Sequence, residues 1–189
     1  MTRTGFTLIE LIIVIAIIAI LATTVILVLN PAVILAEARD SQRIADLSQV
    51  NSALGLYLAT SGGGSLGDAS KCHVQKTDPV ATAKCGGRHE KETFATDKGR
   101  AVNGTGWIPV DFGAISGGSP LSALPVDPTS NGTFFYSYAV NPLTLTQYEL
   151  NANMESARYG AGGNDDMETD DGGNKPDLYE IGSDPDLDL

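Results

Sequence analysis

Apolar residues are concentrated at the front of the chain. Between Leu11 and Leu29 only Thr23 and Thr24 interrupt a continuous apolar run. As a helix rising about 1.5 Å per residue, the run would span roughly 28 Å, close to the hydrocarbon thickness of a bilayer. A helix that is apolar on all sides must be surrounded by lipid or by other helices. The run therefore predicts a helix made for a membrane or for a helical bundle.

The pattern changes after this run from apolar on all sides to apolar on one side. Asn30-Pro31 predicts a kink, because proline removes a backbone donor and crowds the preceding turn. Apolar residues then recur every three or four positions, which marks one helix face. They are Ile44, Leu47, Val50, Leu54 and Tyr57. We expect one long helix over 6–60, apolar from 6 to 30 and amphipathic from 32 to 60, ended by three glycines at 62–64.

Within the amphipathic half, Asp40, Arg43 and Asp46 are spaced three apart. Side chains three or four residues apart are neighbours on a helix, so these three are expected to pair along it. Each such pair contributes a few tenths of a kcal/mol.

Gly, Ser, Pro, Asn and Asp are frequent in the remaining segment, 61–189. This composition predicts a globular head with long loops. Thr133–Val140 and Leu143–Leu150 predict a hairpin that turns at Asn141-Pro142. Trp107–Val110 and Leu178–Ile181 are shorter candidate strands. A long helix followed by an antiparallel sheet is an α+β fold, in which the strands cover the apolar face of the amphipathic half.

Charge is distributed as unevenly as hydrophobicity. The net charge is −11, and the last 41 residues hold 12 Asp and Glu against Arg158 and Lys175. A nucleic-acid binder is excluded, because phosphate neutralisation needs clustered Lys and Arg. No cofactor is required by the sequence, but carboxylates among glycines suit a hard cation such as calcium. The candidate ligands are Asp165, Asp166, Glu168, Asp170, Asp171 and Asp177. They do not match an EF-hand loop, because Asp171 stands where its glycine should be. A merely solvated acidic surface is the alternative.

Cys72 and Cys85 are the only cysteines, and a disulfide between them would contribute about 3 kcal/mol by closing a short loop. His73 and His89 lie nearby, so a Cys2His2 zinc site is the alternative, although the cysteine spacing matches no standard zinc finger. The same segment is locally basic, with Lys71, Lys76, Lys84, Arg88 and Lys91. These residues are either solvated or in contact with an acidic tail.

Catalytic motifs are absent from the sequence: there is no nucleophile elbow, no His-Glu-x-x-His, no phosphate loop and no dinucleotide fingerprint. With only two histidines, both beside the cysteines, acid–base chemistry by His is not expected. We therefore expect a protein that is not an enzyme.

The residues before the apolar run indicate which kind of N-terminal segment it belongs to. A cleaved secretory signal would have a shorter apolar region followed by a small-x-small site, and an ordinary anchor leaves Glu10 unexplained. Gly5-Phe6-Thr7-Leu8-Ile9-Glu10, with Arg3 upstream, resembles the N-terminus of type IV prepilins and of type II secretion pseudopilins. The resemblance covers about 30 residues, and it implies a type IV pilin fold for the whole chain.

The resemblance also implies how the chain is processed. A prepilin peptidase would remove the cytoplasmic leader 1–5 by cutting between Gly5 and Phe6, and the new amine of Phe6 would be methylated. In a bundle of such helices the buried amine and the Glu10 carboxylate of a neighbour would pair. Any other register leaves a charge unpaired, at a cost of several kcal/mol, so the pair would set the axial stagger. Pairing of Glu10 with its own amine is the alternative.

The resemblance further implies location and partners. The chain would be a single-pass protein of the inner membrane with its head outside the cytoplasm, and then part of a pilus at the cell surface. Counting basic residues alone does not favour this orientation, because Arg39 and Arg43 outnumber Arg3. The expected partners are related pilin subunits, the prepilin peptidase, the assembly platform of the inner membrane and the membrane itself.

Three functions remain open at this point. The first is a structural subunit of a type IV pilus. The second is a type II secretion pseudopilin, whose major form binds calcium in a loop late in the head; Leu124–Pro128 and the acidic tail favour it, whereas the bulk of the head and its cysteine loop favour the pilus. The third is a monomeric membrane-anchored binding module, which requires neither the cut at Gly5 nor Glu10.

Overall fold

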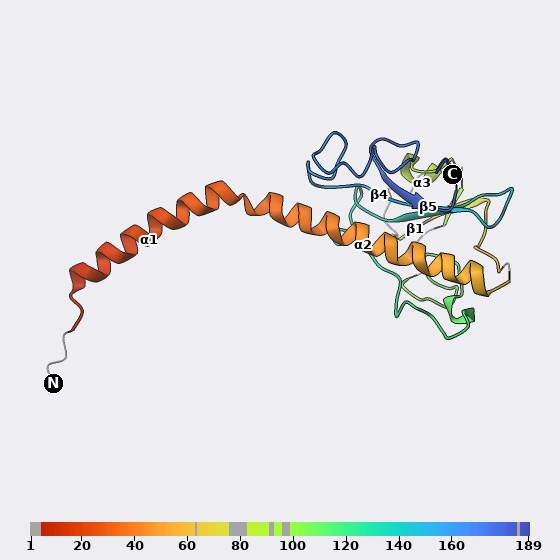
Figure 1. Ribbon diagram of the computed structural model, residues 1–189, viewed down its shortest axis with the longest axis horizontal. Helices are drawn as coiled ribbons and strands as arrows, with labels where there is room; N and C mark the ends of the chain where they lie inside the picture. Colours follow the sequence, from red (N-terminus) through yellow and green to blue (C-terminus); the bar gives the residue numbers. More distant parts are fainter. Residues whose placement is uncertain (1–4, 63, 76–82, 91–92, 96–98, 185) are drawn as a thin grey trace. The chain divides into compact units, whose positions relative to one another are not determined.

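The computed structural model describes residues 5–62, 64–75, 83–90, 93–95, 99–184 and 186–189. It divides the chain into two compact units, Met1–Ala36 and Glu37–Leu189. Helix α1 (Leu8–Leu29) is followed along the chain by α2 (Pro31–Thr60), as Figure 1 shows. Asn30 between them has a left-handed backbone with φ of 38°. The break predicted at Asn30-Pro31 is therefore confirmed. The leader and the domain boundaries at 5/6 and 60/61 stay predictions.

The second unit is built on a mixed sheet of five strands in the order β2-β1-β3-β4-β5. Its strands are β1 (Lys71–Val74), β2 (Thr93–Ala95), β3 (Ser137–Val140), β4 (Tyr148–Ala152) and β5 (Tyr179–Gly182). All neighbouring strands are antiparallel except β1 and β2, which are parallel. A short turn, α3 (Ala83–Gly87), lies between β1 and β2 in the chain, and a 3₁₀ turn, η1 (Phe112–Ala114), precedes β3. The fold is α+β, as expected, but the sheet is not purely antiparallel.

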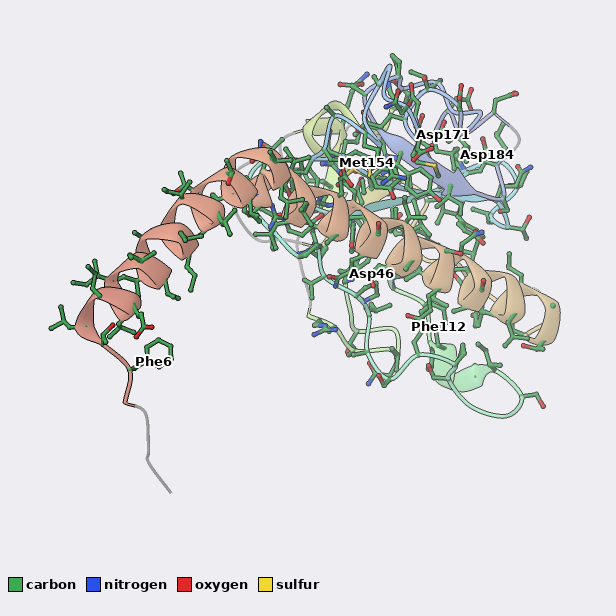
Figure 2. The ribbon with its side chains drawn as sticks, turned by 60° about the vertical axis from the view of Figure 1, so that its left-hand side comes forward. Phe6, Asp46, Phe112, Met154, Asp171 and Asp184 are labelled. Carbon is green, nitrogen blue, oxygen red and sulfur yellow. A yellow bond between two sulfur atoms is a disulfide. The ribbon has the colours of Figure 1, made fainter. Side chains whose placement is uncertain are left out.

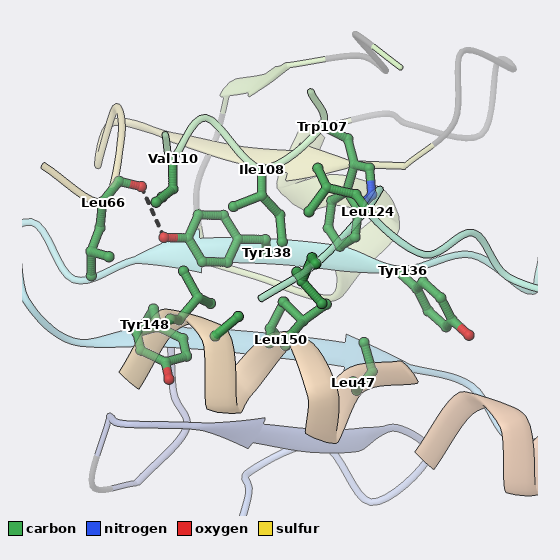
Figure 3. Packing of buried hydrophobic residues seen from close by; sticks show 14 of the residues in the cluster. Leu47, Leu66, Trp107, Ile108, Val110, Leu124, Tyr136, Tyr138, Tyr148 and Leu150 are labelled. Carbon is green, nitrogen blue, oxygen red and sulfur yellow. Dashed lines mark hydrogen bonds between the residues drawn. The ribbon is translucent and has the colours of Figure 1, made fainter. Parts of the chain in front are cut away.

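The core lies between α2 and one face of the sheet. The predicted apolar face of the helix is confirmed, because Leu47, Val50, Leu54 and Tyr57 are buried and Ile44 is partly buried. They pack against the helix-side residues of β3 and β4 (Figure 3), which alternate with residues on the other face. Tyr138 is fully buried, and its hydroxyl donates to the carbonyl of Leu66 at 2.8 Å. Burial raises the pKa of Tyr138 well above its ordinary value.

Several predicted strands differ from the observed ones. The hairpin exists, but its strands are shorter and its turn runs from Asn141 to Gln147, leaving Leu143 91% exposed. The predicted strand over 143–147 is therefore wrong, because Asn141 organises a turn: its side-chain oxygen accepts from the Leu143 N–H at 2.9 Å. The strand predicted at Leu178–Ile181 is confirmed within one residue as β5.

Trp107, Ile108 and Val110 are buried and Pro109 is partly buried, but Trp107–Val110 is not a strand. The Trp107 indole donates to the carbonyl of Pro125 at 3.1 Å, so a loop rather than a sheet neighbour satisfies it. Strands β1 and β2 were not predicted. They are short and flank the cysteine loop, and sequence periodicity is weak over three or four residues.

A buried ion network ties α2 to two loops of the head. The Arg43 guanidinium, fully buried, donates to Asp40 at 2.7 Å and to both carboxylate oxygens of Asp127 at 2.7 and 3.0 Å. Asp40 in turn accepts from the backbone N–H groups of Glu155 and Ser156. Burial alone would lower the pKa of Arg43, but the carboxylates of Asp127 and Asp40 outweigh it and raise that pKa.

The expected pairing along the helix is thus only partly right. Arg43 and Asp40 do pair, but the pair is buried. Most of its other hydrogen bonds go to the two loops that contain Asp127 and Glu155. Asp46 does not pair with Arg43, because its carboxylate accepts from the Tyr136 hydroxyl at 2.9 Å. Asp127 belongs to the Pro-x-Asp-Pro segment, whose role in this fold is to hold Arg43.

Candidate functional site

The predicted processing point lies in a non-helical segment just before α1. Gly5, Phe6 and Thr7 have no regular secondary structure, and Phe6 is 82% exposed (Figure 2). No atom of the described structure lies within 4 Å of the position that a Cβ on Gly5 would take. The Gly5–Phe6 bond is therefore sterically open in the isolated chain, which suits cleavage there. Residues 1–4, with Arg3, lie outside the described residues.

Thr7 and Glu10 form a capping box at the start of α1. The Thr7 hydroxyl accepts from the Glu10 N–H at 3.3 Å, and the Glu10 carboxylate accepts from the Thr7 N–H at 2.9 Å and from its hydroxyl at 2.7 Å. Both contacts satisfy donors that a helix start leaves unpaired. Thr7 was not predicted as a functional residue, although a Thr-x-x-Glu spacing before an apolar run is the signal for this motif.

The capping box uses only one side of the Glu10 carboxylate. All of its contacts go to Oε2, and within the described chain Oε1 accepts no hydrogen bond. The carboxylate is thus held at the helix start with one oxygen free for a second cation. The pairing of Glu10 with an amine of a neighbour, or of its own chain, stays a prediction.

Helix α1 exposes apolar side chains around its whole circumference (Figure 2). Its segment Leu8–Ile26, 19 residues long, is long and apolar enough to cross a membrane. Thr23 and Thr24 do not break this surface, because their hydroxyls donate to carbonyls of the preceding turn, at 2.8 Å to Ala19 and 2.9 Å to Ile20. The exposed apolar surface continues past the break, with Val33, Ile34 and Leu35 between 44% and 57% exposed.

The cysteine loop forms a second candidate site. Cys72 and Cys85 are joined by a disulfide, so their sulfurs are not zinc ligands and the predicted disulfide is confirmed. The three basic residues of the loop that the structure describes do not form a free patch. Lys71 pairs with Asp68 at 2.9 Å, Lys84 with Glu90 at 2.8 Å, and Arg88 is buried. Lys76 and Lys91 lie outside the described residues.

Arg88 is instead held by neutral acceptors. Its guanidinium donates to the carbonyls of Phe135 and Thr133 and to the Asn153 side chain, and it stacks on the Phe135 ring with 3.5 Å between the guanidinium carbon and the ring centroid. Burial, which disfavours the charged form, lowers the pKa of Arg88 to about 9. Arg88 thus anchors the cysteine loop to the sheet rather than binding an acidic partner.

The six acids proposed for calcium are mostly used inside their own loop. Asp166 accepts from the backbone N–H groups of Gly162, Glu168 and Thr169, while Glu168 is buried and accepts from those of Met154 and Ala161. Hydrogen bonds from Thr169 lower the pKa of Asp166, whereas burial raises the pKa of Glu168.

The other four acids are dispersed. Asp165 pairs with Arg158 at 2.6 Å, Asp171 accepts from the backbone N–H groups of Gly173 and Glu180, and Asp170 and Asp177 are exposed. Asp166, Asp170 and Asp171 share a hollow of about 300 Å³. Over the described part of the chain, however, no three His, Cys, Asp or Glu side chains are placed to hold a metal. Calcium binding by this segment therefore stays a prediction.

At the front of the chain, a capped helix that is apolar on all sides follows an exposed Gly-Phe junction. Residues 1–26 match the family model of the prokaryotic N-terminal methylation motif, which confirms the resemblance to prepilins and pseudopilins in this segment. This motif is one of processing and structure and not of catalysis. No curated protein and no solved structure significantly matches the chain.

Proposed function

We propose that the protein is a structural subunit of a type IV pilus, processed at Gly5–Phe6 by a prepilin peptidase and polymerised through its N-terminal helix. The observation that carries this proposal is the match of residues 1–26 to the methylation motif, on a helix whose described apolar side chains are exposed. Such a helix needs a lipid or protein environment on every side.

The extent of the apolar surface favours assembly over a monomeric anchor. The 22 residues of α1 rise about 33 Å, which already fills the roughly 30 Å hydrocarbon core of a bilayer. Val33, Ile34 and Leu35 come after it and are exposed in the isolated chain. Neighbouring helices of the same kind would cover them in a filament, whereas a lone anchor would leave them at the membrane surface.

The free oxygen of Glu10 supports the same proposal. In the membrane the capping box gives the carboxylate two donors from its own chain, which reduces the cost of burying it. In the filament Oε1 would accept from the methylated amine of a neighbouring Phe6, and that pair would set the stagger between subunits. Methylation keeps the positive charge of the amine, so it leaves this pairing intact.

Electron microscopy of sheared surface material, probed with an antibody against the head, tests the proposal. Long labelled filaments are expected. Short assemblies confined to the cell envelope would point to the second candidate, a type II secretion pseudopilin, which the acidic segment 165–177 favours. Single membrane-bound chains would contradict both.

A substitution at Glu10 tests the role of the carboxylate. The Glu10→Ala variant should still be cut after Gly5 but yield few filaments, because the amine of each subunit loses its partner. Mass spectrometry of the N-terminus and filament counts provide the two readings. Asp170→Ala, which removes an exposed carboxylate in the head, serves as the control and should assemble normally. Abundant normal filaments from Glu10→Ala would show that this carboxylate does not set the register.

A further inference from the structure

A buried polar cluster lies on the face of the sheet that α2 does not cover. Side chains alternate along a strand, and Tyr148, Leu150 and Ala152 of β4 belong to the helix-side core. Glu149 and Asn151 therefore lie on the opposite face. Glu180 of β5 is the register partner of Asn151 and shares that face, and both glutamates are only 1% exposed.

The two glutamates are diagonal neighbours on adjacent strands and lie on the same face of the sheet, which brings two buried carboxyl groups close together. Glu149 accepts from the Asn151 side chain at 3.0 Å and from the Leu189 N–H at 2.8 Å, and its Oε1 lies 3.3 Å from Nδ1 of His89. Glu180 accepts from the Lys175 N–H at 2.8 Å through Oε2. Each carboxyl group thus holds a different outer segment of the chain.

Two polar atoms of this cluster lack a hydrogen bond. Within the described residues, Oε1 of Glu180 and Nδ1 of His89 are buried and unpartnered. An unpaired buried carboxylate is costly, and two adjacent carboxylates do not ionise together readily. A proton on Glu180, donated to Glu149, removes both problems. A metal ion would do the same, but the described residues provide no group of three ligands for one.

The other charges around Glu180 add to its need for a proton. Asp171 lies against it from the acidic loop and accepts from the Glu180 N–H. Lys175 faces it only with its backbone, since its ammonium group pairs with Glu90 at 3.2 Å. No cation of the described chain forms an ion pair with Glu180 itself.

We propose that Glu149 and Glu180 share one proton, and that this proton is a pH-sensitive latch that holds three outer segments on the sheet. The segments are residues 83–90, residues 171–175, and the last residues, 187–189. They are packed tightly: a Cβ on Gly173 would overlap Oε2 of Glu180, and the Glu90 N–H donates to the carbonyl of Leu189 at 2.7 Å. Loss of the proton places two buried negative charges in contact, and the segments move out to admit water.

The direction of the pH effect follows from linkage. Burial and the neighbouring Glu149 raise the pKa of Glu180 from its ordinary 4.5 to about 8. Between these two values the unfolded chain has released the proton and the folded chain still binds it. Stability therefore falls as pH rises from about 4.5 to about 8 and changes no further above that range.

The experiment is a pH titration of the full chain in detergent, with glutamate labelled at its carboxyl carbon. In the wild type, NMR should show one glutamate titrating near pH 8. This signal should be missing in Glu180→Gln and should move to lower pH in Glu149→Gln, where burial still keeps it above its ordinary value. Glu180→Gln keeps the shape and the donor of the protonated acid. It should therefore fold and melt at a higher temperature than the wild type at pH 9, but not at pH 4.5. Asp111→Asn, at an exposed acid outside the cluster where asparagine can still accept from the Gly113 N–H, is the control and should behave as the wild type.

Limited proteolysis across the same pH range tests the movement. Cleavage within 83–90 and 171–175 should increase above pH 8 in the wild type and not in Glu180→Gln. The proposal fails if every glutamate titrates below pH 6, if EDTA changes the titration, or if cleavage rises equally in both proteins. None of these readings requires a filament, so they do not depend on the proposed pilus function.

Discussion

At the scale of single residues, the front of the chain combines chemistry for processing and for folding within six positions. Gly5 and Phe6 lie in an open, non-helical segment, and Thr7 and Glu10 begin the helix. The carboxylate of Glu10 therefore has two tasks: it satisfies N–H groups of its own helix start, and it remains available to a second cation. Sequence reasoning identified the charge but not the cap, because it considered Glu10 only as a partner for the amine.

Substitution of Gly5 tests the processing point. We expect Gly5→Ala to leave the full-length precursor in the membrane, because the peptidase must fit the residue before the cut into its site. The space around Gly5 is open, so the added methyl group should not disturb the chain itself. Mass spectrometry of the membrane fraction measures the outcome. Gly55→Ala in α2, also open on that side, is the matched control and should be cut normally. Normal processing of Gly5→Ala would contradict the prepilin interpretation.

At the scale of elements, α2 depends on one buried arginine for its attachment to two loops. Arg43 contacts Asp40 on its own helix and Asp127 in the loop before β3, and it stacks on Phe134 at 4.7 Å from the ring centroid. The Asp40 carboxylate also accepts hydrogen bonds from the backbone N–H groups of Glu155 and Ser156. The helix spacing of Asp40 and Arg43 indicated a pair, but only the folded head shows that the pair is internal.

Replacement of Arg43 should lower the free energy of unfolding substantially. Arg43→Met leaves Asp40 and Asp127 as buried charges without a cation, which destabilises a protein by about 3–5 kcal/mol. Arg39→Met, one turn earlier, removes a partly exposed pair with Glu155 and should cost much less. Denaturant unfolding of the detergent-solubilised chain measures both. If both variants lose the same free energy of unfolding, the buried network around Arg43 does not stabilise the attachment of α2 to the loops.

At the scale of the whole molecule, the chain separates its apolar and acidic residues at opposite ends of the sequence. The first 148 residues have a net charge of −1 and the rest −10. Much of this acidity is nevertheless used internally, by Asp166, Glu168 and Asp171 as acceptors for loop backbone and by Glu149 and Glu180 as a buried pair. The tail is therefore part of the folded head and not simply a solvated acidic extension.

The calcium prediction belongs to this scale. If the acidic segment holds calcium, EDTA should lower the melting temperature of the full chain at pH 7 and added calcium should restore it, because a ligand that binds only the folded state stabilises that state. Asp170→Asn together with Asp171→Asn should weaken this response, whereas Asp186→Asn should not. A melting curve that is the same with and without EDTA would remove the prediction.

The sequence by itself determined the features that local pattern controls. An unbroken apolar run, a Pro-containing break, a three-to-four residue spacing and a short specific motif each act over neighbouring residues. They correctly predicted α1, the break at Asn30-Pro31, the buried face of α2 and the prepilin-type start. Cys72 and Cys85 were predicted to pair because they are the only two cysteines.

The tertiary structure decided what depends on residues far apart in the chain. Strands β1 and β2 are too short to show a recognisable alternation of apolar and polar residues. The apolar residues of Trp107–Val110 are compatible with a buried loop as well as with a strand. The partners of Arg43, Arg88, Glu149 and Glu180 come from segments tens of residues away. A charged side chain can be buried only where the fold collects such partners, and that information is not present in any local stretch of sequence.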